Sequence, residues 1–130
     1  MIEKEFVTYK QALALKELGF DEPCIGYYYN NKIYFNSPGV NVAGPSGEQP
    51  LPLKQQVFRW FREKHGMCSW IDRMYTENHI VYYRWTIEKP ITDPPNYNNT
   101  WITLKEYSTY EEAENACIDK LIEICKNKKQ

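Results

Sequence analysis

Residues 80–87 read IVYYRWTI, and this run of β-branched and aromatic residues decides the fold because it is the strongest strand signal in the chain. A similar run precedes it at residues 69–75, and Glu77-Asn78 between the two runs is typical of a turn. We therefore predict a β-hairpin that covers residues 69–87.

Helices are predicted on both sides of this hairpin. Before it, residues 53–65 carry apolar side chains at helical spacing between Pro52 and Gly66, which suit the two ends of a helix. After it, residues 101–107 alternate as a strand does, and Ser108 to Glu111 form a capping box that opens a C-terminal helix. Residues 53–126 thus have the order helix–strand–strand–strand–helix.

The first third of the chain also predicts a helix followed by a hairpin, but it shares no sequence motif with residues 53–87 that would indicate a repeat. A capping box from Thr8 to Gln11 predicts a helix over residues 9–18. Residues 24–35 are predicted to form a second hairpin around Asn30-Asn31, since Asn tolerates the positive φ of a type I′ turn. Residues 36–52 and 89–100 are rich in Pro, Gly and Asn and are predicted to be mobile loops.

Together these elements predict one α+β domain over residues 1–130, with two β-hairpins and a short strand forming mainly antiparallel sheet packed with three helices. The length of 130 residues allows one core without disulfides or metal. The side chains predicted to form that core are Leu15, Leu18, Ile25, Trp60, Phe61, Ile80, Tyr82, Trp85, Leu104, Ala113, Cys117, Leu121 and Ile124.

The composition indicates which cellular compartment and which classes of partner to expect. The formal net charge of −1 gives no global attraction to nucleic acid or to a membrane surface. No apolar run approaches the roughly 18 residues of a membrane span. The four cysteines show no metal-binding or redox spacing, and we expect reduced structural thiols in a cytoplasmic protein, with no metal and no cofactor.

The sequence shows no recognisable catalytic constellation, and we expect no enzymatic activity and no catalytic residues. Neither His65 nor His79 lies in a hydrolase, kinase or metalloprotease motif. The segment GPSG at residues 44–47 resembles a phosphate-binding loop, but Glu48 and Pro50 follow where such a loop needs a lysine and free amides.

Residues 58–64 read FRWFREK and favour one alternative function, nucleic-acid binding. On a helix Trp60 and Phe61 turn inward and the basic residues face solvent. Phe58 fits neither side, and we predict it as a binding residue that reaches a second element or a partner. Residues 53–87 contain six basic and three acidic residues, a local charge of +3. The residues predicted to bind in this alternative are Arg59, Arg62, Lys64, Arg73 and Arg84, with Tyr83 or Trp70 as a stacking platform.

The order of elements in residues 53–126 is that of double-stranded-RNA-binding domains. Those domains hold phosphates with lysines at the start of their second helix, where this chain has Glu111, Glu112 and Glu114. The order of elements matches, but the charge at the position that would contact phosphate is reversed.

Three segments carry a resemblance to a known group of proteins: LGFDEPC at residues 18–24, FRWFREKHG at residues 58–66 and YEEAE at residues 110–114. Their sequence and order resemble short hypothetical proteins encoded by tailed phages and prophages of gut Bacteroidetes-type bacteria. The resemblance implies an accessory role in the cytoplasm of a host cell and supplies no site residues.

Our leading functional hypothesis is therefore a non-enzymatic protein that binds a host or phage macromolecule. Tyr and Trp are abundant here and are favoured at protein interfaces. Tyr28, Tyr29 and Tyr34 are predicted to be exposed, because a lone hairpin cannot bury both of its faces. We expect a protein partner, and homodimerisation through a hairpin edge is one form that the binding could take.

Overall fold

The fold is α+β, as predicted, in a computed structural model that describes residues 2–39, 48–89, 100–103 and 105–128. Its elements are η1 (Ile2–Glu5), α1 (Tyr9–Glu17), β1 (Cys24–Tyr29), β2 (Lys32–Gly39), β3 (Gln49–Leu51), α2 (Lys54–His65), β4 (Cys68–Tyr75), β5 (Val81–Glu88), β6 (Thr100–Ile102) and α3 (Tyr110–Lys128). The helix–strand–strand–strand–helix order of the second half is confirmed.

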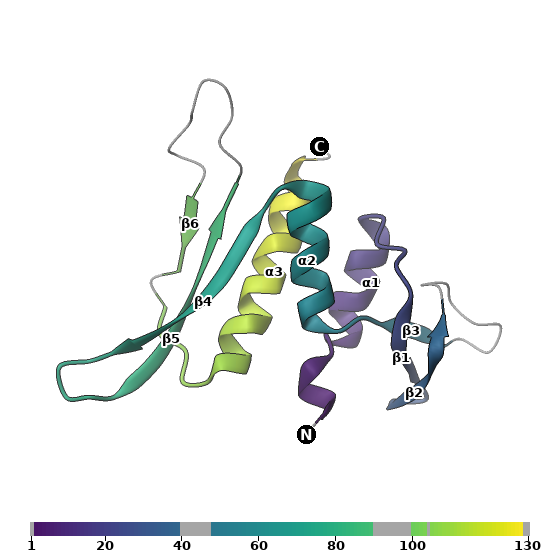
Figure 1. Cartoon of the computed structure of the whole chain (residues 1–130), viewed down its shortest axis with the longest axis horizontal. Helices are drawn as coiled ribbons and strands as arrows, with labels where there is room; N and C mark the ends of the chain where they lie inside the picture. The colour runs from purple at the N-terminus through teal and green to yellow at the C-terminus, as the bar shows by residue number, and fades with distance from the viewer. Residues whose placement is uncertain (1, 40–47, 90–99, 104, 129–130) are drawn as a thin grey trace.

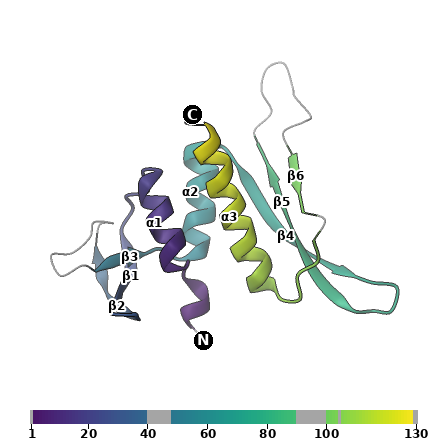
Figure 2. The same ribbon diagram turned by 180° about the vertical axis from the view of Figure 1, so that it is seen from behind.

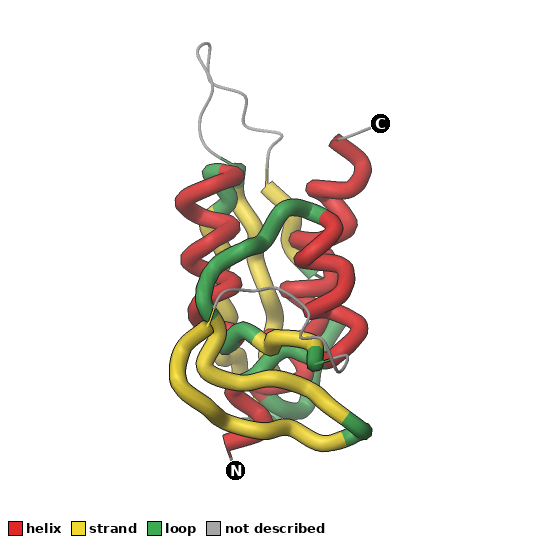
Figure 3. Tube along the Cα trace, turned by 90° about the vertical axis from the view of Figure 1, so that its right-hand side faces the viewer, coloured by secondary structure: helices red, strands yellow, loops and turns green. Residues whose placement is uncertain are grey.

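The described strands form two separate antiparallel sheets, one on each side of the helices. The first sheet has the order β2-β1-β3 and the second has the order β4-β5-β6. Figures 1 and 2 show the three helices between the sheets, with α1 beside the first sheet and α3 against the second. Figure 3 looks at the first sheet from outside, where β1 and β2 lie in front of the helices.

Local sequence signals explain where several elements begin and end. The Thr8 hydroxyl accepts a hydrogen bond from the Gln11 amide, and the Gln11 side chain accepts one from the Thr8 amide, which confirms the first capping box. Asn30 and Asn31 have φ of 51° and 64°, as a type I′ turn requires. Gly66 ends α2 in the left-handed conformation.

The C-terminal helix begins one residue later than its capping box predicted. The hydroxyl that accepts the Glu112 amide at 3.1 Å belongs to Thr109, so Thr109 rather than Ser108 caps α3. Tyr110, on the first turn of this helix, is 42% exposed, and its ring makes an edge contact with the Tyr83 ring of β5.

The buried hydrophobic side chains form one cluster to which all three helices and both sheets contribute. Of the predicted core, Ile25 and Ile80 are 40% and 63% exposed, and Tyr82 is only half-buried. Ile25 alternates with Cys24 and Gly26, which take the inward positions of β1, and Ile80 precedes the first residue of β5. Leu104 lies outside the described residues, and the other predicted core side chains are buried.

Two predicted loops and one predicted strand need correction. β2 continues through residues 36–39 and β3 covers residues 49–51, so the predicted loop 36–52 contains strand residues at both ends because each pairs with β1. Residues 40–47 and 90–99 lie outside the described residues. The predicted strand 101–107 is shorter, since β6 ends at Ile102 and Tyr107 returns to β5 only as an isolated bridge to Tyr83.

No helix in the described part of the chain has both the length and the apolar character needed to cross a membrane.

Candidate functional site

The outer side of the first sheet carries a row of aromatic side chains, which we call the tyrosine face (Tyr27, Tyr29 and Tyr34). Tyr27 and Tyr34 lie opposite each other on β1 and β2, and their rings stack with centroids 5.4 Å apart. Tyr29 follows Tyr27 on the same side of β1 by strand alternation. Tyr29 and Tyr34 are 40% and 38% exposed, so two predicted site residues lie together on one open surface.

Tyr28, the third predicted exposed tyrosine, lies on the opposite side of the sheet. Its ring centroid is 4.7 Å from that of Tyr9 at the start of α1, and its hydroxyl donates to Asn31 Oδ1 at 3.2 Å. The side chain is half-buried. Strand alternation is the reason, because adjacent residues of β1 must face opposite sides.

Within residues 58–64 of α2, the basic side chains face solvent, as predicted. Arg59 Nη2 lies 3.7 Å from Glu22 Oε1, an exposed ion pair, while Arg62 and Lys64 are also exposed. Phe58 is half-buried and, with Arg62, lines a hollow of about 230 Å³ between α2 and β4 that Trp70 also lines. The structure therefore brings two predicted site residues next to one predicted stacking platform.

Arg73 and Arg84 lie on opposite faces of the second sheet. The Arg73 guanidinium lies 5.3 Å from the centroid of the Tyr75 ring, on the same side of the sheet as its cross-strand partner Tyr83. Arg84 projects from the other side, and its Nη2 lies 3.7 Å from Met74 Sδ. The five basic residues of the nucleic-acid hypothesis are thus distributed over several surfaces.

A charged pair is buried between α2 and α3. Lys54 Nζ lies 3.8 Å from Glu114 Oε1, and Gln55 Nε2 donates to Glu114 Oε2 at 3.2 Å. Burial raises the pKa of Glu114, although the Lys54 charge and the Gln55 hydrogen bond partly oppose this shift. The sequence analysis did not predict this pair. The helical spacing of Glu114 from Cys117 and Leu121 could have indicated that Glu114 lies on the buried side of α3.

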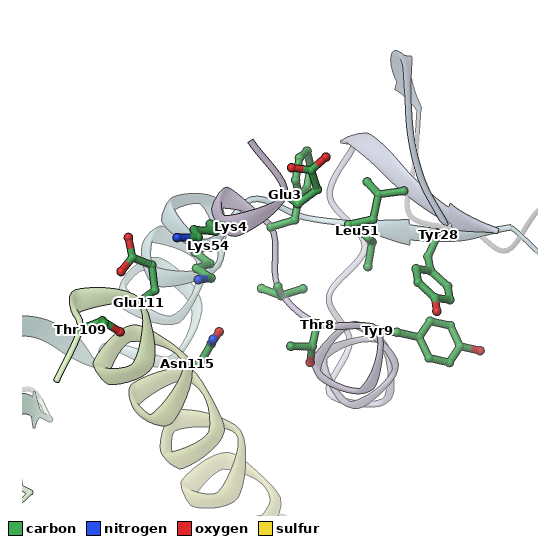
Figure 4. Close-up of a pocket in the computed structure, with 13 residues that line it drawn as sticks. Glu3, Lys4, Thr8, Tyr9, Tyr28, Leu51, Lys54, Thr109, Glu111 and Asn115 are labelled. Carbon is green, nitrogen blue, oxygen red and sulfur yellow. The ribbon is translucent and has the colours of Figure 1, made fainter. Parts of the chain in front are cut away.

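A groove of about 410 Å³ lies between the inner side of the first sheet and the starts of the three helices (Figure 4). It is lined by Glu3, Lys4, Phe6, Val7, Thr8, Tyr9, Tyr28, Ile33, Leu51, Lys54, Thr109, Glu111 and Asn115. These residues come from distant segments, and no local pattern in the sequence marked them as a site.

The cysteine and histidine side chains do not line this groove. Burial raises the pKa of Cys24 and of Cys117 to about 12, so neither thiol is a ready thiolate nucleophile. His65 packs against Trp60 at 4.8 Å, and His79 is exposed in a turn with φ of 62°. Among the described residues, no group of three or more His, Cys, Asp or Glu side chains is placed to hold a metal ion.

Comparisons with protein-family models, with curated proteins and with solved structures give no significant match.

Proposed function

We propose that this protein is a non-enzymatic interaction protein that docks on another protein through its tyrosine face. The observation that carries the proposal is the exposure of Tyr29 and Tyr34 on a sheet face against which no described helix packs. Tyrosine favours interfaces because its rigid ring buries a large apolar area while its hydroxyl still finds a hydrogen-bond partner.

The charge around the tyrosine face indicates what the partner presents. β1 and β2 contain no acidic residue, and Lys32 is the cross-strand partner of Tyr29. We therefore expect a protein surface with apolar side chains flanked by carboxylates. The resemblance to phage-encoded proteins makes host and phage proteins in the host cytoplasm the natural candidates, and a second copy of the chain is a further candidate.

The test compares the loss of exposed tyrosines from the first sheet with the loss of an exposed tyrosine from the second sheet. Capture from infected cells followed by quantitative mass spectrometry is done with the wild type, with the double variant Tyr29→Ser/Tyr34→Ser, and with Tyr75→Ser. Tyr75 is the matched control because it is more exposed than either residue and lies on the second sheet. We expect proteins that the wild type and the control retain and the double variant loses.

Two outcomes would count against the proposal. If the double variant captures the same proteins as the wild type, the tyrosine face is not the docking surface. If no variant captures any protein and the chain sediments as a strict monomer, the interaction role itself is contradicted.

A second candidate is nucleic-acid binding at the hollow between α2 and β4. The observation in its favour is that Arg62 lies beside Phe58 and Trp70, a cation next to two aromatic rings. Single- and double-stranded DNA and RNA are titrated at low and at moderate salt, since binding through phosphates weakens as salt rises. Arg62→Gln/Trp70→Ala should abolish binding while Arg59→Gln, outside the hollow, should reduce it only slightly. Absence of binding at low salt removes this candidate.

A further inference from the structure

The groove of Figure 4 has the dimensions of a ligand site. Its volume of about 410 Å³ falls in the range of roughly 300–1,000 Å³ that is typical of small-molecule pockets. It lies on the inner side of the first sheet, opposite the tyrosine face, so it is independent of the docking surface proposed above. Its two ends differ in chemistry, and that difference indicates what it binds.

One end of the groove holds polar groups that lack good partners. The Asn115 side-chain oxygen is buried and accepts no hydrogen bond, whereas the Asn115 carbonyl accepts one from Gln11 Nε2 at 3.2 Å. Lys54 is only 3% exposed, and its 3.8 Å contact with Glu114 is too long for a hydrogen bond. Because buried polar groups are almost always hydrogen-bonded, this end calls for a ligand that both donates and accepts.

Further charges of both signs surround these two groups. Lys4 and Glu111 lie at the same end of the groove as Lys54, and Glu3 also lines the groove (Figure 4). A ligand with a single charge would meet one favourable and one unfavourable set of neighbours. A ligand that carries an anionic and a cationic group close together would match both sets.

The other end is aromatic and apolar. Tyr9 and Tyr28 lie there with their rings in contact, and the buried Leu51 lies near them (Figure 4). These side chains have the character of a pocket for an apolar group of moderate size.

We propose that the groove binds a small zwitterion with an apolar side chain, that is, a free α-amino acid of the phenylalanine or leucine type. The carboxylate accepts from the ammonium groups of Lys54 and Lys4. The ligand's ammonium group donates to Asn115 Oδ1 and is attracted by Glu111. The apolar side chain packs against Tyr9, Tyr28 and Leu51.

Binding is measured by calorimetry and by thermal unfolding of the full chain in the presence of each proteinogenic amino acid at millimolar concentration. We expect L-phenylalanine or L-leucine to raise Tm, because a ligand that binds only the folded state stabilises it. For phenylalanine, 3-phenylpropionate lacks the ammonium group, phenethylamine lacks the carboxylate, and glycine lacks the side chain. Loss of the ammonium group or of the carboxylate should weaken binding by about tenfold or more, since it leaves a buried group unpaired. Glycine should also bind more weakly, because it buries no apolar side chain.

The variant Asn115→Ala separates ligand binding from folding. Its oxygen accepts no hydrogen bond in the protein and Ala favours a helix, so Tm without ligand should be unchanged or higher. Affinity for the amino acid should fall by about tenfold or more. Asn127→Ala, near the other end of α3, and Lys16→Gln, on α1 outside the groove, are controls that should bind like the wild type.

The proposal is overturned if no amino acid binds, if 3-phenylpropionate or phenethylamine binds as tightly as phenylalanine, or if Asn115→Ala retains wild-type affinity. None of these results depends on the tyrosine face, so the proposed docking function would be unaffected.

Discussion

At the residue scale, Gly26 of β1 packs directly against the ring of Phe6. A Cβ atom at Gly26 would lie 2.6 Å from Cε1 of the Phe6 ring, and Phe6 is itself buried. Gly26→Ala should therefore destabilise the protein by about 1–3 kcal/mol through overpacking, as measured by urea denaturation.

A double-mutant cycle identifies the cause of this loss. In a Phe6→Ala background, Gly26→Ala should cost little, because the ring it meets is absent. Gly19→Ala is the contrasting control, since Gly19 has φ of 99° and open space around its Cα, so its cost comes from backbone strain and should not depend on Phe6. Equal costs of Gly26→Ala in both backgrounds would contradict the predicted contact.

The buried carboxylate of Glu114 makes stability depend on pH. Burial raises the pKa of Glu114 above its ordinary value of 4.5, so the folded protein binds this proton more tightly than the unfolded chain does. The stabilisation from the protonated acid is complete below pH 4.5 and is lost as the pH rises above that value. Relative to Glu114→Gln, the wild type should lose stability as the pH rises toward neutrality, as measured by denaturation across that range. Glu112→Gln, on the exposed side of α3, is the control. If the wild type loses stability with rising pH relative to this variant as well, burial of Glu114 is not the cause of the trend.

At the element scale, the start of α3 depends on one hydroxyl. Thr109→Ala removes the acceptor of the Glu112 amide and should cost about 1 kcal/mol in denaturant unfolding. Ser108→Ala should cost much less, because Ser108 precedes the cap. A larger loss at Ser108 than at Thr109 would mean that the helix begins one residue earlier, as the sequence pattern alone predicted.

Sequence predicted best the features that depend on neighbouring residues. The Asn30-Asn31 turn, the Thr8 capping box and the glycine that ends α2 are fixed by local backbone chemistry, and all three are confirmed. The division into two sheets was not predicted, and neither was β3, which contains Pro50 and is a strand only because β1 pairs with it.

The candidate sites also differ in whether neighbouring residues or distant segments form them. The sequence predicted exposed tyrosines in the first hairpin without assigning them to one side of β1. The prediction of exposure is confirmed for Tyr29 and Tyr34 and is wrong for Tyr28, which packs on Tyr9. The groove could not be predicted, because distant segments of the chain supply its lining and only their packing brings Lys54 near Asn115.

At the scale of the whole molecule, α3 connects the parts of the core. It packs against both other helices and against β4 and β5, and Leu121 on its buried face is inaccessible to solvent. Leu121→Ala should cost about 2–5 kcal/mol, measured by denaturation, because it leaves a cavity at this junction. Amide hydrogen exchange in this variant should accelerate in both sheets together. A loss of unfolding free energy below about half a kcal/mol would contradict the central position of α3.

The two sheets turn their outer faces away from each other, with the helices between them (Figure 1). Exposed aromatic or aliphatic side chains lie on both, Tyr29 and Tyr34 on the first and Trp70 and Ile102 on the second. Under the docking function proposed above, a partner held at the tyrosine face leaves the outer side of the second sheet accessible, so one chain would be able to hold two macromolecules at once. Two molecules bridged in this way would meet at a high effective concentration, and their association would be strongest when the bridging chain does not outnumber them.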